Sequence, residues 1–131
     1  MMDALKYQRL TILWALFVFA MCNAKFGHVG ESHLFFPGFD KMVHCGFFFV
    51  LTVFWCNGLI RQQNTRVLQY KYAIGIGLLA IAFGGLIELL QLTVFTWRDG
   101  DWNDLFADSV GAGMAIFSIL VTVNAVNHVK S

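Results

Sequence analysis

The chain has 131 residues, of which 58% are hydrophobic and only 13% are charged, and its formal net charge is +1 at pH 7. A soluble domain of this size cannot bury so much apolar side chain, so a membrane is its natural solvent. The small net charge gives no case for a nucleic-acid partner. The composition predicts an all-α integral membrane protein, with residues 1–131 forming a single domain.

Four apolar stretches follow one another along the chain. They run from about Leu10 to Phe26, Met42 to Ile60, Ala73 to Phe95 and Leu105 to Val126. Each is close to the length of about 17–25 residues that crosses the hydrocarbon core of a bilayer. The breaks between them contain Pro37, the only proline, and most of the charged residues. We therefore predict a bundle of four transmembrane helices.

The first stretch also has features of a signal peptide, because it is N-terminal, has basic flanks and contains Cys22. However, the bulky Met21 before Cys22 makes a poor lipoprotein cleavage site, and no good small-x-small site follows. We therefore expect the stretch to be retained as a membrane helix.

Basic residues are divided unequally between the two sides of the predicted bundle. Six of the nine belong to the N-terminus, the second connection and the C-terminus: Lys6, Arg9, Arg61, Arg66, Lys71 and Lys130. The other three belong to the first and third connections: Lys25, Lys41 and Arg98. The positive-inside rule then places both termini in the cytoplasm and the first and third connections outside.

Glu88 and Gln91 lie inside the predicted third helix, three residues apart and therefore on one face. A carboxylate costs roughly 2.5 kcal/mol or more at the centre of a transmembrane helix and less near its end. It persists where it faces a protein-lined or wet cavity and has a partner. Glu88 is therefore the first candidate for a functional residue.

Further polar residues gather at helix ends on the same, outer side. Asp40, Lys41 and His44 stand at the start of the second helix, and Asp101, Asp104 and Asp108 form a stripe at the start of the fourth. We predict an outward-opening polar pocket with Glu88 at its floor and Arg98 as a countercharge at its mouth. Its predicted ligand-binding residues are Asp40, Lys41, His44, Glu88, Gln91, Arg98, Asp101, Asp104 and Asp108.

Simpler roles exist for single members of this set. Asp40 and Asp101 are good helix N-caps, and Asp104 follows Asp101 at the spacing of a capping box. His44 alone would more often be a core histidine bonded within its helix. Asp104 and Asp108 could belong to a solvated face of a helix that starts late.

The order of these motifs resembles the VanZ-like family of small bacterial membrane proteins. The resemblance covers about Asp40 to the C-terminus and rests on Asp40-Lys41 with His44, on Glu88-Leu-Leu-Gln91, and on Arg98, Asp104 and Asp108 ahead of Gly111 and Gly113. One departure is Asp108, where the family often carries Asn. The family is named for a protein associated with resistance to the glycopeptide teicoplanin.

The resemblance implies a multi-pass protein of the bacterial inner (cytoplasmic) membrane, linked to lipids, a lipid-linked cell-wall precursor or a glycopeptide at the outer leaflet. It implies no reaction. The sequence predicts no cofactor, and it leaves open whether the chain forms a homo-oligomer.

Three functions are compatible with the predicted pocket. In the first, it binds a polar headgroup, sugar or peptide. In the second, the chain is an enzyme acting on a lipid-linked substrate, with Glu88 or His44 as general base. No metal site is predicted, although in this enzyme Asp104 with Asp108 could hold a divalent cation. In the third, Glu88 is a proton or cation site of a transporter. Four helices are few for an alternating-access carrier, and the sequence shows no inverted repeat.

Overall fold

Five helices make up the protein in a computed structural model that describes residues 2–23, 39–64, 68–94 and 102–130. In chain order they are α1 (Met2–Tyr7), α2 (Arg9–Asn23), α3 (Phe39–Gln62), α4 (Tyr70–Thr93) and α5 (Trp102–Lys130). No β-strand occurs within these ranges. The predicted all-α class is confirmed.

Three of the helices are long and apolar enough to cross a membrane, over Lys41–Gln62, Tyr70–Thr93 and Trp102–Val123. The chain is thus indicated to be a membrane protein. Helix α2 is apolar as well, but its 15 residues span only about 22 Å, less than the ~30 Å core of a bilayer. The predicted first stretch continues to Phe26, and residues 24–26 lie outside the described part of the chain.

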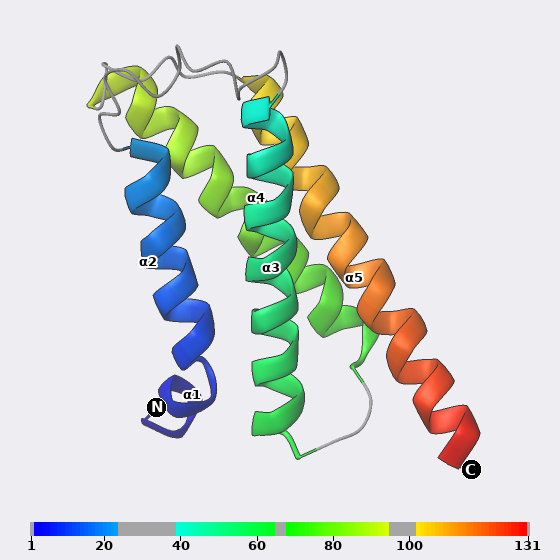
Figure 1. Cartoon of the computed structure of the whole chain (residues 1–131). Coiled ribbons are helices and arrows are strands. Elements are labelled where there is room, and N and C mark those ends of the chain that lie inside the picture. The colour runs from blue at the N-terminus through cyan, green and yellow to red at the C-terminus, as the bar shows by residue number, and fades with distance from the viewer. Residues whose placement is uncertain (1, 24–38, 65–67, 95–101, 131) are drawn as a thin grey trace.

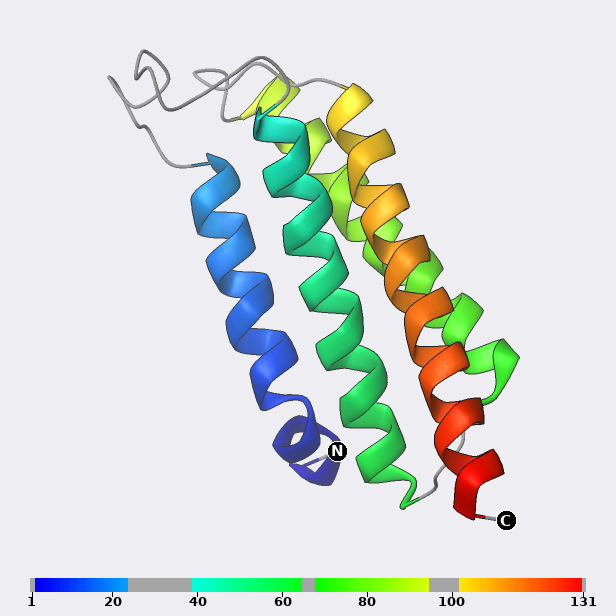
Figure 2. The same ribbon diagram turned by 45° about the vertical axis from the view of Figure 1, so that its right-hand side comes forward.

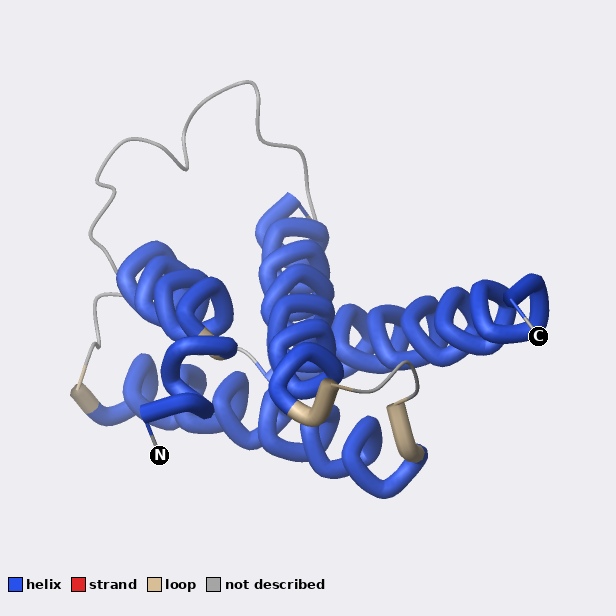
Figure 3. Tube along the Cα trace, turned by 90° about the horizontal axis from the view of Figure 1, so that it is seen from below, coloured by secondary structure: helices blue, strands red, loops and turns tan. Residues whose placement is uncertain are grey.

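Helix α3 stands at the centre of the bundle and contacts each of the other four helices (Figure 1). Figures 1 and 2 show the start of α1, the end of α3, the start of α4 and the end of α5 toward one end of the bundle. The ends of α2 and α4 lie at the other end, with the starts of α3 and α5. Seen from below, the C-terminal half of α5 extends away from the other helices (Figure 3).

The outer surface of the bundle is apolar on every long helix. Exposed large side chains include Leu13 and Leu16 of α2, Met42 of α3, Leu78 of α4, and Phe106 and Phe117 of α5. Phe117 has 72% of its surface exposed. Exposing so much apolar surface to water is unfavourable, and soluble proteins rarely do so. Lipid tails, in contrast, solvate such a surface.

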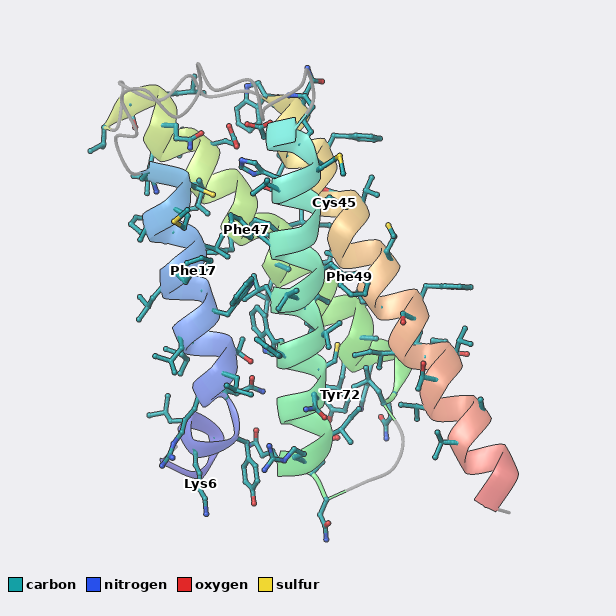
Figure 4. The ribbon with its side chains drawn as sticks, viewed as in Figure 1. Lys6, Phe17, Cys45, Phe47, Phe49 and Tyr72 are labelled. Carbon is teal, nitrogen blue, oxygen red and sulfur yellow. The ribbon has the colours of Figure 1, made fainter. Side chains whose placement is uncertain are left out.

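Aromatic side chains join α2 to α3. The indole Nε1 of Trp14 donates a hydrogen bond to the carbonyl oxygen of Phe47 over 2.9 Å. The ring of Phe47 also lies edge-on to those of Trp14 and Phe17, with ring centroids 6.0 and 5.7 Å apart. Figure 4 shows Phe17 and Phe47 in the space between the two helices. This contact gives the indole N–H a hydrogen-bond partner within the protein.

A cavity of about 290 Å³ lies between α2, α3 and α4, beside the N-terminal half of α2 and the second half of α3. The atoms that line it are almost all apolar, including those contributed by the two polar residues. The lining residues are Gln8, Thr11, Ile12, Ala15, Leu51, Trp55 and Phe83. None of the residues predicted to bind a ligand belongs to it. The cavity is therefore separate from the polar residues at the other end of the bundle.

Helices α3 and α5 approach most closely at Gly111. A Cβ atom there would collide with the backbone carbonyl of Cys45 and lie 3.1 Å from the backbone nitrogen of Phe49. Figure 4 shows Cys45 and Phe49 on the side of α3 toward α5. Backbone atoms cannot rotate away as a side chain can, so only glycine fits at this crossing. This is the function of small residues between transmembrane helices.

We expect Gly111→Ala to lower the stability of the bundle by about 1–3 kcal/mol, the usual cost of overpacking. Gly113→Ala is the matched control, because a Cβ at Gly113 of the same helix meets nothing within 4 Å. Thermal unfolding of both variants in detergent micelles measures the difference. Equal midpoints for the two variants would contradict the close α3–α5 contact.

Candidate functional site

The polar residues lie where the starts of α3 and α5 meet the ends of α2 and α4 (Figure 1). We call this region the polar end and define it by Lys41, His44, Glu88, Gln91, Asp104 and Asp108. Except for Lys41, whose side chain is 37% exposed, all of these residues are buried. The structure thus brings together six of the nine residues predicted from the sequence.

The central contact of the polar end joins α3 to α5. The Nδ1 atom of His44 lies 3.0 Å from Oδ1 of Asp108, a hydrogen-bond distance between two buried side chains. The two residues are 4% and 1% exposed. His44 therefore does not bond within its own helix through this nitrogen, and Asp108 does not belong to a solvated face. Both of these simpler expectations are wrong, because the Gly111 crossing brings the two helices together.

Glu88 comes to this pair from α4 and is fully buried. One ring nitrogen of His44, one carboxylate oxygen of Glu88 and one of Asp108 all lie within 4.8 Å of one another. At about 1.5 Å per residue, Glu88 is roughly 7.5 Å from the end of α4, His44 roughly 7.5 Å from the start of α3, and Asp108 roughly 9 Å from the start of α5. The three groups therefore meet at one depth.

The sequence placed Glu88 deeper than the other two, as the floor of a pocket. The difference arises because α3 and α5 begin at Phe39 and Trp102, three residues before the predicted Met42 and Leu105. His44 and Asp108 lie deeper in their helices as a result. Asp40 consequently occupies the second position of α3 rather than the N-cap position expected for it.

A chain of charged groups leads from this cluster toward the surface. The Oδ2 atom of Asp104 lies 3.7 Å from Nε2 of His44, and the Nζ atom of Lys41 lies 3.2 Å from the other carboxylate oxygen of Asp104. Both ring nitrogens of His44 thus face carboxylates. Because Lys41 is the most exposed member, the three residues Lys41, Asp104 and His44 lead from the surface of the protein into the bundle.

Gln91 connects the polar end to α2, a contact that the sequence pattern did not suggest. Its Nε2 atom donates a hydrogen bond of 2.8 Å to the carbonyl oxygen of Cys22. Among the described residues, its carboxamide oxygen has no hydrogen-bond partner, although Gln91 is 97% buried. The side chain therefore retains one buried acceptor. No pattern in the sequence relates Cys22 to Gln91, because the contact is made by a backbone carbonyl.

A glycine of α4 makes room for the Asp108 carboxylate. A Cβ at Gly84 would lie 2.7 Å from Oδ2 of Asp108 and 3.3 Å from the ring of Phe48. Gly84 stands one turn before Glu88, so α4 presents a small residue and then a carboxylate to the same neighbour. The space that glycine leaves on this face of α4 is thus occupied by the Asp108 carboxylate.

The side chains of three predicted residues lie outside the described part of the structure. Arg98 and Asp101 lie outside the described residues, and for Asp40 only the backbone is described. The predicted countercharge at the mouth of the site and the predicted cap of α5 therefore stay predictions.

Comparisons of the chain with protein-family models, with curated proteins and with solved structures find no match.

We expect Gly84→Ala to destabilise the bundle because the new methyl group displaces the Asp108 carboxylate. The cost is about 1–3 kcal/mol, as for other overpacked positions. Gly85→Ala is the matched control, since a Cβ at Gly85 meets nothing within 4 Å. Thermal unfolding should also show that the penalty of Gly84→Ala becomes smaller in an Asp108→Ala background, where the displaced group is gone. An unchanged penalty would show that Gly84 does not act on Asp108.

Proposed function

We propose that the chain crosses the bacterial inner membrane four times, with both termini in the cytoplasm and the polar end at the outer leaflet. The distribution of Lys and Arg supports this orientation. So does the arrangement of the helices, since the start of α1, the end of α3, the start of α4 and the end of α5 share one end of the bundle (Figure 2). In this topology α2 belongs to the fourth crossing.

Reporter fusions test this topology in a bacterial host. A fluorescent protein that folds only in the cytoplasm should be active after Lys130 and within residues 63–68. Alkaline phosphatase, which requires export, should be active within residues 27–36 and inactive at the other two sites. Phosphatase activity after Lys130 would overturn the proposed orientation and place the polar end on the cytoplasmic side.

The function that we propose is that of a VanZ-like envelope protein, which binds or modulates a polar lipid headgroup, a lipid-linked precursor or a glycopeptide at the outer leaflet. The observation that carries this proposal is the buried group of His44, Glu88 and Asp108, contributed by three helices at one depth. The Lys41–Asp104 pair would lie between this group and the lipid headgroups.

Magnitudes argue against a purely structural role for the group. Polar contacts between transmembrane helices contribute about 0.6 kcal/mol on average and at most about 1.7 kcal/mol. A single carboxylate within the membrane costs roughly 2.5 kcal/mol or more at mid-depth and less toward the surface. A charged carboxylate at mid-depth therefore costs more than one average polar contact between helices gains. Recognition of a polar molecule gives these side chains a role that an apolar core could not perform.

Catalysis is the second candidate, and the contact between His44 and Asp108 favours it. A carboxylate at 3.0 Å from one ring nitrogen orients a histidine and sets its tautomer, as in many acid–base sites. In this reading His44 or Glu88 is the general acid or base acting on a lipid-linked substrate, and Asp108 orients His44.

Binding is measured with the full chain in phosphatidylcholine nanodiscs, titrated with teicoplanin and with a short-chain lipid-linked muropeptide precursor. We expect at least one probe to bind, and Glu88→Gln and His44→Gln each to weaken it by about tenfold or more, the equivalent of ~1.4 kcal/mol. Leu89→Ala is the control. Leu89 follows Glu88 in the chain, but its side chain lies on the exposed face of α4, away from the polar end.

Two results would decide against headgroup binding. One is the absence of binding to either probe, and the other is binding that both polar-end variants leave unchanged. Mass spectrometry of the same samples distinguishes the second candidate, since conversion of the precursor that is lost in Glu88→Gln would establish an enzyme.

A further inference from the structure

The cluster of His44, Glu88 and Asp108 has the composition and geometry of a metal site. It offers one imidazole nitrogen and two carboxylate oxygens from α3, α4 and α5, all within 4.8 Å of one another and all buried. Two ligand atoms of the same ion lie at most about 4.4 Å apart, because Zn–N and Zn–O bonds are about 2.0–2.2 Å long. In the tetrahedral arrangement typical of zinc, two ligand atoms lie about 3.4 Å apart. Separations as large as the 4.8 Å upper limit would therefore have to shorten by more than about 1 Å for the three groups to close around an ion.

The ligand types select the class of cation. Imidazole suits zinc and its neighbours among the transition metals, whereas Mg²⁺ and Ca²⁺ favour sites of oxygen alone. A set of one nitrogen and two oxygens matches a divalent transition-metal ion. Three protein ligands also leave a coordination position open for water or for an oxygen of another molecule.

The surroundings of His44 correspond to those of metal-binding histidines. Such a histidine almost always donates its second ring N–H to a carboxylate or carbonyl, which fixes the ring and its tautomer. If an ion takes the place between Nδ1 of His44 and Oδ1 of Asp108, then Nε2 faces Asp104 at 3.7 Å. Lys41 in turn holds the other oxygen of Asp104 at 3.2 Å. The cluster thus has a set of ligands and, beyond them, a carboxylate that would orient the histidine after moving closer by about 0.5–1 Å to hydrogen-bond distance.

A further buried group lies beside the cluster without its full complement of bonds. Gln91 is three residues from Glu88 and so shares its face of α4. Its buried carboxamide oxygen accepts no hydrogen bond from the described residues. Gln91 therefore leaves a buried acceptor on the same helix face as Glu88.

We infer that His44, Glu88 and Asp108 bind one divalent transition-metal ion of the zinc class, and that the ion presents an open coordination position at the outer side of the membrane. The binding of the ion depends on these residues alone. Its task, to hold an anionic oxygen of a headgroup, rests on the proposed function.

The test uses the full chain in detergent micelles, stripped with a chelator and then titrated with Zn²⁺ alone. We expect about one Zn²⁺ per chain, measured by elemental analysis after gel filtration. X-ray absorption spectroscopy of this sample should show a first shell of nitrogen and oxygen with a single imidazole. Titration with Mg²⁺ and Ca²⁺ should not displace the zinc.

Substitutions test which side chains bind the Zn²⁺ ion. His44→Gln, Glu88→Gln and Asp108→Asn keep the side chains similar in size, and each should weaken Zn²⁺ binding by more than about 100-fold, whereas Asp104→Asn should weaken it about 10–100-fold. His33→Gln and His128→Gln are controls for binding by other histidines and should bind as the unaltered chain does. Circular dichroism and gel filtration establish that each variant is folded.

The inference is overturned if the unaltered chain binds no Zn²⁺, if sulfur or several imidazoles appear in the first shell, or if folded ligand variants bind as before. The spectroscopic result on the unaltered chain stands even where a variant fails to fold. Because the probe is the metal alone, its outcome is independent of headgroup binding. Zinc binding without any headgroup affinity would leave the site intact and remove the proposed function.

Discussion

The close crossing of α3 and α5 at Gly111 is the constraint on which the polar end depends. Because no Cβ fits against the carbonyl of Cys45, the two helix backbones come nearly into contact. His44 precedes Cys45, and Asp108 stands one turn before Gly111, so the crossing sets these short side chains 3.0 Å apart. Helix α4 joins in the same manner, since Gly84 admits the carboxylate of Asp108 and Glu88 follows one turn later. Small residues thus position the polar ones.

The two halves of the bundle are held by different interactions. Away from the polar end, aromatic contacts of Trp14 join α2 to α3, and the side chain of Gln8 donates a hydrogen bond of 3.2 Å to the carbonyl of Trp55. These contacts satisfy their polar groups locally and leave the outer surface apolar. At the polar end, by contrast, buried His44, Glu88 and Asp108 from three helices lie within 4.8 Å of one another. The apolar contacts and the buried polar contacts thus occupy different parts of the bundle.

Several features of the site were predictable because they depend on helical periodicity alone. The spacing of Glu88 and Gln91, and that of Asp104 and Asp108, places each pair on one helix face whatever the neighbours are. The helix starts were less predictable. Hydropathy marks where apolar residues begin, whereas α3 and α5 both begin three residues earlier, and this moved His44 and Asp108 to the depth of Glu88. Gln91 was predicted as a site residue, but its bond to Cys22 was not, since backbone carbonyls carry no residue-specific signal.

The sequence by itself determined that the chain is helical, that it is built for a membrane, and which polar side chains would be costly there. These properties follow from composition and period, which act within single helices. Only the tertiary structure decided that His44 turns its two nitrogens toward Asp108 and Asp104, and that Glu88 joins them from α4. The physical reason is that such contacts depend on the distance between helices, and this distance is set by steric fit at Gly111 and Gly84, which no pattern along one helix contains.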